Sequence, residues 1–338
     1  MKVRDFGKNN IFLPDATKGA IKFLTTQQLK STGIQGIVVN TLHLLINLGV
    51  DKLEALQGIK NIMNWNGYVV SDSGGFQVYS LIHSGKWKGK IHKNGVTFKA
   101  PVDGKQYDLT PEASIDIQLA IGADVLVCLD DCRFTDISKK EAKISVDRTL
   151  RWAVRCKEHF EKRKVDYPQK LLSCVVQGAG YLDLREECTK QLVDMDFDGY
   201  NFGGYVIDGG GNLVVNELET VVQYLPKDKF RYVMGAGKPE DIRKCVNMGY
   251  TVFDTVLTTR NARHGSLYSF DEENYLLKIT NAKYAYDQNP LDSTCDCEAC
   301  VNYSRAYINY LLKIKEPTGY TLATIHNLRF YQRFVEGL

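Results

Sequence analysis

Short apolar segments alternate with longer amphipathic segments along most of the chain. The apolar segments are rich in β-branched residues and lack polar alternation, which is typical of strands buried on both faces. Strands of this kind, joined by helices, form a mostly parallel sheet with right-handed crossovers. Eight of them predict an α/β fold, a (β/α)8 TIM barrel, with a doubly wound sheet as the alternative. The predicted strands are residues 21–24, 37–40, 69–72, 125–130, 171–178, 199–204, 231–237 and 251–257.

Amphipathic patterns between these segments predict helices. Residues 111–123, 182–195 and 239–248 have helical periodicity, and the last begins with Pro-Glu-Asp, a favourable first helical turn. The chain changes character after residue 280, where a cysteine cluster, several tyrosines and two more helical patterns (303–314 and 320–335) follow. We therefore predict two units: a catalytic barrel over residues 1–280 and a small C-terminal subdomain over residues 281–338.

Polar residues or glycines end nearly every predicted strand. In barrels, the carboxyl ends of the strands and the loops after them form the active site. Asp and Asn also favour ordinary turns, but Asp72, Asp130 and Asp254 each follow a segment too apolar for a surface strand. We therefore expect these side chains to converge at one mouth of the barrel. The strand-end residues are Asn40, Asp72, Asp130, Gln177, Gly203, Gly204, Gly235 and Asp254.

Composition and charge narrow the class of protein. The chain has 338 residues, of which 44% are hydrophobic, and a net charge of +3, which excludes a disordered chain. No apolar run approaches the ~18–20 residues of a membrane-spanning helix. The N-terminus carries no apolar region of a secretory signal. Because acidic and basic residues nearly balance, a nucleic-acid partner would require a local basic patch.

The cysteines predict a metal site. Six of the nine cysteines are dispersed, and three form the pattern Cys295-x-Cys297-x-x-Cys300. Because the number is odd and no export signal is visible, we expect a reducing cytoplasm and a metal cluster rather than disulfides. This spacing places three thiolates on one tight turn, and His326 on a following helix completes a tetrahedral set. Such a set favours one structural Zn²⁺ per chain, with no open coordination position.

The residues at the predicted mouth suit a flat, purine-like ligand. Asp72 begins the turn Asp-Ser-Gly-Gly-Phe-Gln, whose glycines let the backbone approach a ligand on which Phe76 can stack. Asp130, Gln177 and the amides at residues 203–204 supply acceptors and donors for the edge of a base. The thioether of Met234 could cover the opposite face of the ring, although a core position is the commoner one for methionine.

Cations follow the last predicted strand. Arg260 and Arg263 lie just beyond Asp254. They could simply neutralise this aspartate, or they could hold phosphates or bases while Asp254 acts on a sugar carbon. Lys238 is a third local cation. Local cations on a nearly neutral chain suit a short single-stranded target better than a long duplex.

With these motifs, the chain resembles the tRNA-guanine transglycosylases (queuine tRNA-ribosyltransferases) of the bacterial type. The resemblance extends nearly from end to end. The resemblance depends on three specific motifs: the DSGGFQ turn, the Cys3His cluster and the segment FDTVLTTRNARHG. Further matching segments are NTLHLL, MNWNG, DGKQYDLTPEASIDIQ, DFDGY, VMGAGKPED, NAKY, CDCEACVNYSRAYI and TIHNLRF.

The resemblance implies an activity and roles for individual residues. The enzyme would exchange guanine at the anticodon wobble position of a tRNA with a GUN anticodon for a 7-deazaguanine base such as preQ1. Asp254 would be the nucleophile, which bonds covalently to the ribose, and Asp72 the general acid and base. Substrate-binding positions would be Ser73, Gly74, Gly75, Phe76, Asp130, Gln177, Gly203, Gly204, Tyr205 and Met234. RNA-binding positions would be Gly235, Lys238, Thr259, Arg260, Asn261, Ala262 and Arg263.

The resemblance also implies a homodimer in which the zinc subdomain contributes to the interface. The loop after Gly204 lacks the glutamate usual in the family, so preQ1, preQ0 and queuine stay open as the base; Asp208 is a candidate replacement, and the bulk of Ile207 favours a compact base. Two other functions stay open: insertion of the base into DNA by the same fold, and a non-catalytic RNA-binding subunit. The presence of both Asp72 and Asp254 argues against the second.

Overall fold

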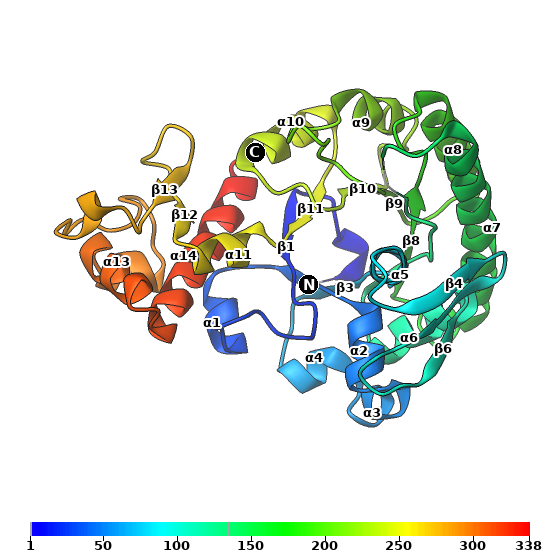
Figure 1. Cartoon of the computed structure of the whole chain (residues 1–338), viewed down its shortest axis with the longest axis horizontal. Coiled ribbons are helices and arrows are strands. Elements are labelled where there is room, and N and C mark those ends of the chain that lie inside the picture. The colour runs from blue at the N-terminus through cyan, green and yellow to red at the C-terminus, as the bar shows by residue number, and fades with distance from the viewer. Residues whose placement is uncertain (1, 134) are drawn as a thin grey trace.

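A computed structural model describes residues 2–133 and 135–338, and within them eight parallel strands form a barrel surrounded by helices (Figure 1). The strand order is β1-β11-β10-β9-β8-β7-β3-β2, and the barrel closes where Asp15, just after β1, bridges Val38 of β2. This confirms the predicted barrel over a doubly wound sheet. The strands are β1 (Ile11–Pro14), β2 (Gly36–Val39), β3 (Tyr68–Ser71), β7 (Val125–Val127), β8 (Leu171–Val176), β9 (Gly199–Phe202), β10 (Phe230–Val233) and β11 (Val252–Thr255).

Seven of the eight predicted strands coincide with observed strands, but the prediction for the first was wrong. It placed a strand at residues 21–24, whereas β1 is Ile11–Pro14. Phe12 and Leu13 are fully buried, while Phe23 is 42% exposed and has a φ of 68°, which a strand does not allow. Thr25 then caps the next helix, so the short apolar segment before it serves as a connection.

Helices follow most strands and cover the outside of the barrel (Figure 1). The predicted helices at residues 111–123, 182–195 and 239–248 are confirmed as α6, α8 and α10. Thr110 caps α6 and Pro111 occupies its first turn, as helix chemistry favours. The barrel helices are α1 (Thr26–Ser31), α2 (Thr41–Asn47), α3 (Val50–Ala55), α4 (Gly58–Met63), α5 (Gly75–His83), α6 (Pro111–Ile121), α7 (Lys139–Arg163), α8 (Leu182–Asp194), α9 (Val215–Val222), α10 (Pro239–Met248) and α11 (Leu257–Arg263).

Two small sheets are inserted into this pattern. The first is antiparallel, with the order β4 (Lys88–His92), β5 (Gly95–Lys99) and β6 (Gln106–Leu109), and it lies between α5 and α6 along the chain. The second pairs β12 (Ser266–Tyr268) with β13 (Leu276–Lys278). The remaining helices are α12 (Glu298–Asn302), α13 (Arg305–Lys313), α14 (Pro317–Glu336) and the short 3-10 turns Val3–Asp5 and Ala282–Tyr284.

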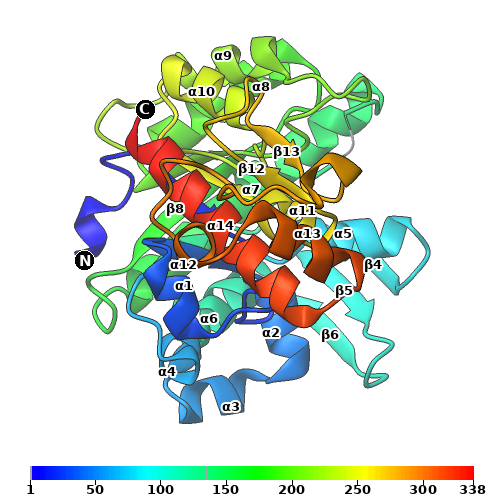
Figure 2. The ribbon, with the colours of Figure 1, turned by 90° about the vertical axis from the view of Figure 1, so that its left-hand side faces the viewer.

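The last helix, α14, connects the C-terminal region to the barrel (Figure 2). Ile325, near the middle of α14, belongs to the apolar cluster around the cysteines, whereas Tyr331 and Phe334 belong to the main core. The ring of Tyr331 lies 4.7 Å from that of Phe12 in β1. The division at residue 280 stays a prediction. Among the described residues, no helix is both long and apolar enough to cross a membrane.

Candidate active site and metal centre

Side chains alternate between the two faces of each strand, and this alternation explains why polar residues gather at the mouth of the barrel. Alternate strand positions form one apolar cluster inside the barrel, including Leu13, Val38, Val70, Val175 and Tyr232. The residue two positions later on each strand points the same way but lies one layer nearer the mouth. These later residues are Asp15, Asn40, Asp72, Gln177 and Met234. The barrel is therefore apolar below and polar at the carboxyl ends of its strands.

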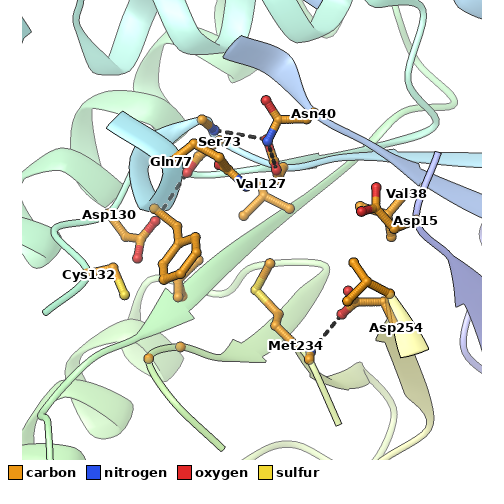
Figure 3. A pocket seen from close by; sticks show the side chains of 18 of the residues that line it. Asp15, Val38, Asn40, Ser73, Gln77, Val127, Asp130, Cys132, Met234 and Asp254 are labelled. Carbon is orange, nitrogen blue, oxygen red and sulfur yellow. Dashed lines mark hydrogen bonds between the residues drawn. The ribbon is translucent and has the colours of Figure 1, made fainter. Parts of the chain in front are cut away.

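Asp254 belongs to the same set of residues at the mouth. It is within β11 and lies two positions after Val252, a member of the same apolar cluster. It lines the same cavity, of about 400 Å³, as Asp72 and Met234, and Figure 3 shows it close to Met234. The two predicted catalytic carboxylates thus border one space.

The carboxylate of Asp72 is held by three donors. Asn40 Nδ2 donates to Oδ2 at 2.6 Å, and the backbone N–H groups of Thr41 and Gly74 donate to Oδ1 at 3.1 and 3.0 Å. Burial outweighs these hydrogen bonds and raises the pKa of Asp72 to about 7. Near neutral pH this group can therefore both give and accept a proton.

The carboxylate of Asp254 has one bonded oxygen and one free oxygen. Tyr232 Oη and the backbone N–H of Gly235 donate to Oδ1 at 2.8 and 2.9 Å. Oδ2 has no hydrogen-bond partner within the described residues. Burial raises the pKa of Asp254 to about 6, against the two hydrogen bonds that lower it. At neutral pH it is mostly ionised, with one oxygen available to an electrophile.

Asp130 is the third predicted carboxylate, and it belongs to a hydrogen-bonded group. Ser73 Oγ donates to its Oδ1 at 3.1 Å, and Gln177 Nε2 donates to its Oδ2 at 2.7 Å. Burial raises the pKa of Asp130 to about 6. Gln177 is buried behind Asp130 and does not line the cavity. Its side chain contacts the Asp130 carboxylate instead.

Two glycines allow this group to form. A Cβ on Gly203 would lie 2.6 Å from Gln177 Nε2 and 2.3 Å from Val175 Cγ1, and a Cβ on Gly75 would lie 2.8 Å from the Asp130 carbonyl oxygen. Neither position has room for a side chain. The close packing of these two turns therefore holds Asp130 at the cavity wall.

Most predicted substrate-binding residues share the cavity. Phe76, in the first turn of α5, is 41% exposed, and its ring lies 5.9 Å from that of Tyr205. Met234, the residue directly after β10, enters the same cavity (Figure 3). The predicted residues that line the cavity are Asp72, Ser73, Gly74, Phe76, Asp130, Gly203, Gly204, Tyr205, Met234, Gly235 and Asp254.

The predicted RNA-binding residues mostly lie outside the cavity. Thr259 and Ala262 are buried, and Asn261 Nδ2 donates to Tyr268 Oη at 2.8 Å. Lys238 and Arg260 are exposed. Arg263 is half-buried and donates to the Thr259 carbonyl oxygen. Lys238 and Arg260 are therefore the members of this set whose side chains are exposed.

Sequence reasoning missed Asp15, which lines the cavity on the same side as Asp254 (Figure 3). Its two oxygens accept from Thr17 Oγ1 at 2.7 and 2.9 Å. Its negative charge helps to raise the pKa of Asp72 and of Asp254. The signal was present, since Asp15 follows an apolar strand as Asp72 does, but that strand was placed ten residues too late.

Arg185 of α8 was also missed. It is fully buried and donates to the carbonyl oxygens of Val176, Ala179 and Gly203 at 2.8 to 3.0 Å. Burial lowers the pKa of Arg185 to about 10, which still leaves it charged at neutral pH. It therefore ties together the loops after β8 and β9.

The cysteine cluster forms a compact donor group. One ligand atom from each of Cys295, Cys297, Cys300 and His326 lies within 4.8 Å of the others, and all four residues are buried. His326 Nδ1 lies 3.2 Å from Cys300 Sγ, and Nε2 lies 2.5 Å from the Tyr268 carbonyl oxygen. That carbonyl orients the ring with Nδ1 toward the thiols, as hydrogen-bond partners of metal-binding histidines do. The group can hold a metal ion, and all nine cysteines are free of disulfides.

Fold and site together define a barrel enzyme that works at a carboxylate-lined mouth. The family model described as "Queuine tRNA-ribosyltransferase" matches residues 7–338. Relatives with the same name come from Pseudoalteromonas translucida (41% identical, 97% of this chain and 84% of the relative), Tolumonas auensis (40%, 97% and 85%) and a Psychrobacter species (40%, 97% and 84%). The chain belongs to the queuine tRNA-ribosyltransferase family, which confirms the predicted resemblance and the prediction that it is a transferase.

Proposed function

We propose that the chain exchanges guanine at the anticodon wobble position of tRNA for a 7-deazaguanine base, through a covalent bond between Asp254 and the ribose. One observation carries the proposal. Asp254, with a free Oδ2, and Asp72, with a pKa of about 7, border the same cavity. A carboxylate that attacks a sugar carbon and a second carboxyl group that moves a proton are the two groups a retaining glycosyl transfer needs.

In the first step, Asp254 Oδ2 attacks C1′ of the nucleotide, and the bond between C1′ and the guanine nitrogen breaks. Protonated Asp72 gives its proton to the departing base, which leaves neutral. The transition state is oxocarbenium-like, and the ionised Asp254 stabilises it. In the second step, Asp72 takes a proton from the incoming base, whose nitrogen attacks C1′ and releases Asp254.

Base recognition falls to the group around Asp130. Its carboxylate accepts from N–H groups on the edge of guanine, and the backbone N–H of Gly204, which has no acceptor within the described part of the chain, donates to the base carbonyl. Phe76 and Met234 cover the two faces of the ring. The hydrogen bonds from Ser73 and Gln177 keep Asp130 in place.

The loop after β9 favours a compact base, which we take to be preQ1-like. Tyr205, Val206 and Ile207 line the cavity with largely apolar groups. Asp208 instead accepts from the backbone N–H groups of Gly210 and Asn212 at 2.9 and 2.8 Å, within its own loop. This hydrogen bonding argues against Asp208 as the replacement for the family's loop glutamate.

The RNA partner is a tRNA with a GUN anticodon, whose wobble nucleotide leaves its stack to reach the cavity. An anticodon loop makes that movement less costly than a duplex does, which favours tRNA over DNA. Lys238 and Arg260 are the exposed cations nearest in sequence to Gly235 and Asp254. They suit the phosphates that flank the flipped nucleotide.

We assign Zn²⁺ to the Cys3His group, since three thiolates and one imidazole are the donors of a structural zinc site. When bound, the ion ties the turn at residues 295–300 to α14 and takes no part in catalysis. We also propose a homodimer. The C-terminal region exposes Tyr310 and Ile314 on and beside α13 and Val301 on α12, side chains that an interface would cover.

The test is incubation of the protein with unmodified tRNA and labelled guanine. Label incorporation that disappears in Asp254→Ala supports the proposal, and competition by preQ1, preQ0 and queuine identifies the base. If the wild-type protein incorporates no label, or if Asp254→Ala stays active, the proposal is wrong. Light scattering of the same preparation gives the oligomeric state.

A further inference from the structure

We propose that a lysine-rich face of the β4–β5–β6 sheet binds the phosphate backbone of the RNA outside the active-site cavity. This face, termed the lysine face, is formed by Lys88 and Lys90 of β4 and Lys99 of β5. The inference rests on the proposed function, which supplies an RNA partner, and assigns this sheet a binding role in addition to that of the cavity.

The register of the sheet places the three lysines together. Lys88 pairs directly with Lys99, and Lys90 pairs with Thr97. Because strand residues alternate between faces, Lys88, Lys90 and Lys99 share the outer face, and all three are exposed. Val96 and Phe98 point to the opposite face and are buried in the main core. The apolar face thus anchors the sheet and leaves the lysines toward solvent.

This arrangement is unfavourable without an anion. Directly opposed residues of an antiparallel pair have Cβ atoms about 5 Å apart, and like charges there destabilise the sheet. Within the described residues, no salt bridge is formed by Lys88, Lys90 or Lys99. The carboxylate on this face, Asp108, accepts from Thr97 Oγ1 at 2.6 Å and forms no salt bridge in the described ranges, so one negative charge faces three lysines.

The surrounding segment concentrates the positive charge of the whole chain. Residues 84–108 contain six lysines, two aspartates and no other ionised residue, a net charge of +4, whereas the entire chain carries +3. None of the six lysines is ion-paired in the part of the chain that the structure describes. They are Lys86, Lys88, Lys90, Lys93, Lys99 and Lys105.

The sheet lies on the side of the molecule where the barrel opens. It follows α5, whose first turn brings Phe76 into the cavity. Figure 2 shows β4, β5, β6 and α5 at the right, with the N-terminus on the far left. A helix the length of α5 spans only about 13 Å, so an RNA held at the cavity passes within reach of the sheet.

Phosphate is the ligand chemistry that fits these observations. Lysine ammonium groups on an exposed sheet bind a repeating anion without reading its bases. Each such contact releases counterions, so the contribution to affinity falls steeply as salt rises. The lysine face therefore contributes affinity for RNA and leaves the chemical step unchanged.

The experiment compares guanine exchange by wild-type protein and by the triple variant Lys88→Gln/Lys90→Gln/Lys99→Gln, with full-length tRNA at several salt concentrations. We expect KM for tRNA to rise about tenfold at low salt, kcat to change less than twofold, and the slope of log KM against log salt to fall by about 2. The corresponding Lys→Arg triple variant keeps the charge and should retain wild-type values.

A matched control removes three exposed lysines at other places: Lys2→Gln/Lys162→Gln/Lys227→Gln. Equal effects in both triple variants, or an unchanged KM and salt slope in the sheet variant, overturn the proposal. Filter binding of tRNA to the same proteins keeps this outcome separate from failure of the proposed function. A wild-type protein that binds tRNA through the lysine face but exchanges no guanine would refute the exchange activity and leave the binding surface standing.

Discussion

Asn40 makes two hydrogen bonds that link a helix cap to a titrating carboxylate. Its Nδ2 donates to Asp72 Oδ2 at 2.6 Å, and its Oδ1 accepts from the His43 N–H in the first turn of α2. One side chain therefore both caps the helix and stabilises the ionised form of Asp72.

Asn40→Ala should extend activity to higher pH. The lost hydrogen bond stabilises ionised Asp72, so its pKa rises above about 7, and the group stays protonated, as base departure needs, to a higher pH. The basic limb of kcat/KM for tRNA should move upward, with a stability loss of about 1 kcal/mol from the missing cap. Ser138→Ala, which removes the cap of α7 far from the cavity, should lower stability alone. A basic limb that stays in place in Asn40→Ala contradicts the role given to Asp72.

Tyr232→Phe should move the acidic limb instead. The phenol donates to Asp254 Oδ1, and its loss raises the pKa of Asp254 above about 6. The nucleophile then ionises at higher pH, so kcat/KM for tRNA declines on the acidic side. Tyr250→Phe is the matched control, because the Tyr250 phenol donates to the Leu218 carbonyl oxygen away from the cavity. The same shift in both variants would mean that the pH profile does not report on Asp254.

Asp15→Asn should displace the whole profile toward acid. The negative charge of Asp15 raises the pKa of both Asp72 and Asp254, so its removal lowers both. An asparagine still accepts from Thr17 Oγ1, which preserves the local fold. Asp51→Asn, at an exposed carboxylate on α3, should leave the profile unchanged. An alkaline displacement would show that Asp15 acts other than by its charge.

Gly203→Ala should weaken base binding. The added Cβ would displace Gln177 from Asp130, so KM for guanine should rise about tenfold, the value of a lost hydrogen bond to a charged group. Overpacking should also cost about 1–3 kcal/mol of stability. Gly209→Ala, further along the same loop, meets no atom within 4 Å and should behave as wild type. Unchanged KM values for guanine in Gly203→Ala would argue against a role of Asp130 in binding the base.

Cys300→Ala should abolish metal binding. We expect one zinc per chain in the wild type and none in this variant by elemental analysis, with a Tm lowered by about 5 °C or more. Cys245→Ala removes another buried thiol, from α10, and should keep the metal despite the cavity that it leaves. Chelator should lower the Tm of wild type and Cys245→Ala only. A folded Cys300→Ala protein that retains zinc contradicts the proposed ligand set.

The sequence predicted the barrel and the convergence at its mouth because both depend on local signals. Buried strands are recognisable by their apolar residues, and parallel strands bring Asp72, Asp130 and Asp254 to one end. Asp15 was missed because a four-residue strand after a charged N-terminus is a weak signal beside the apolar residues at 21–24. The engagement of Gln177 by Asp130 and the burial of Arg185 depend on packing between loops distant in sequence, which periodicity does not encode.

The path of α14 has a consequence for how the molecule unfolds. The same helix carries His326 at the cysteine cluster and Tyr331 in the barrel core, where the Tyr331 phenol donates to the Gly237 carbonyl oxygen at 2.5 Å. Neither the C-terminal region nor the barrel can lose its structure without releasing a helix that the other requires. The chain should therefore melt in a single cooperative transition, in which removing the metal lowers the thermal resistance of the catalytic half as well.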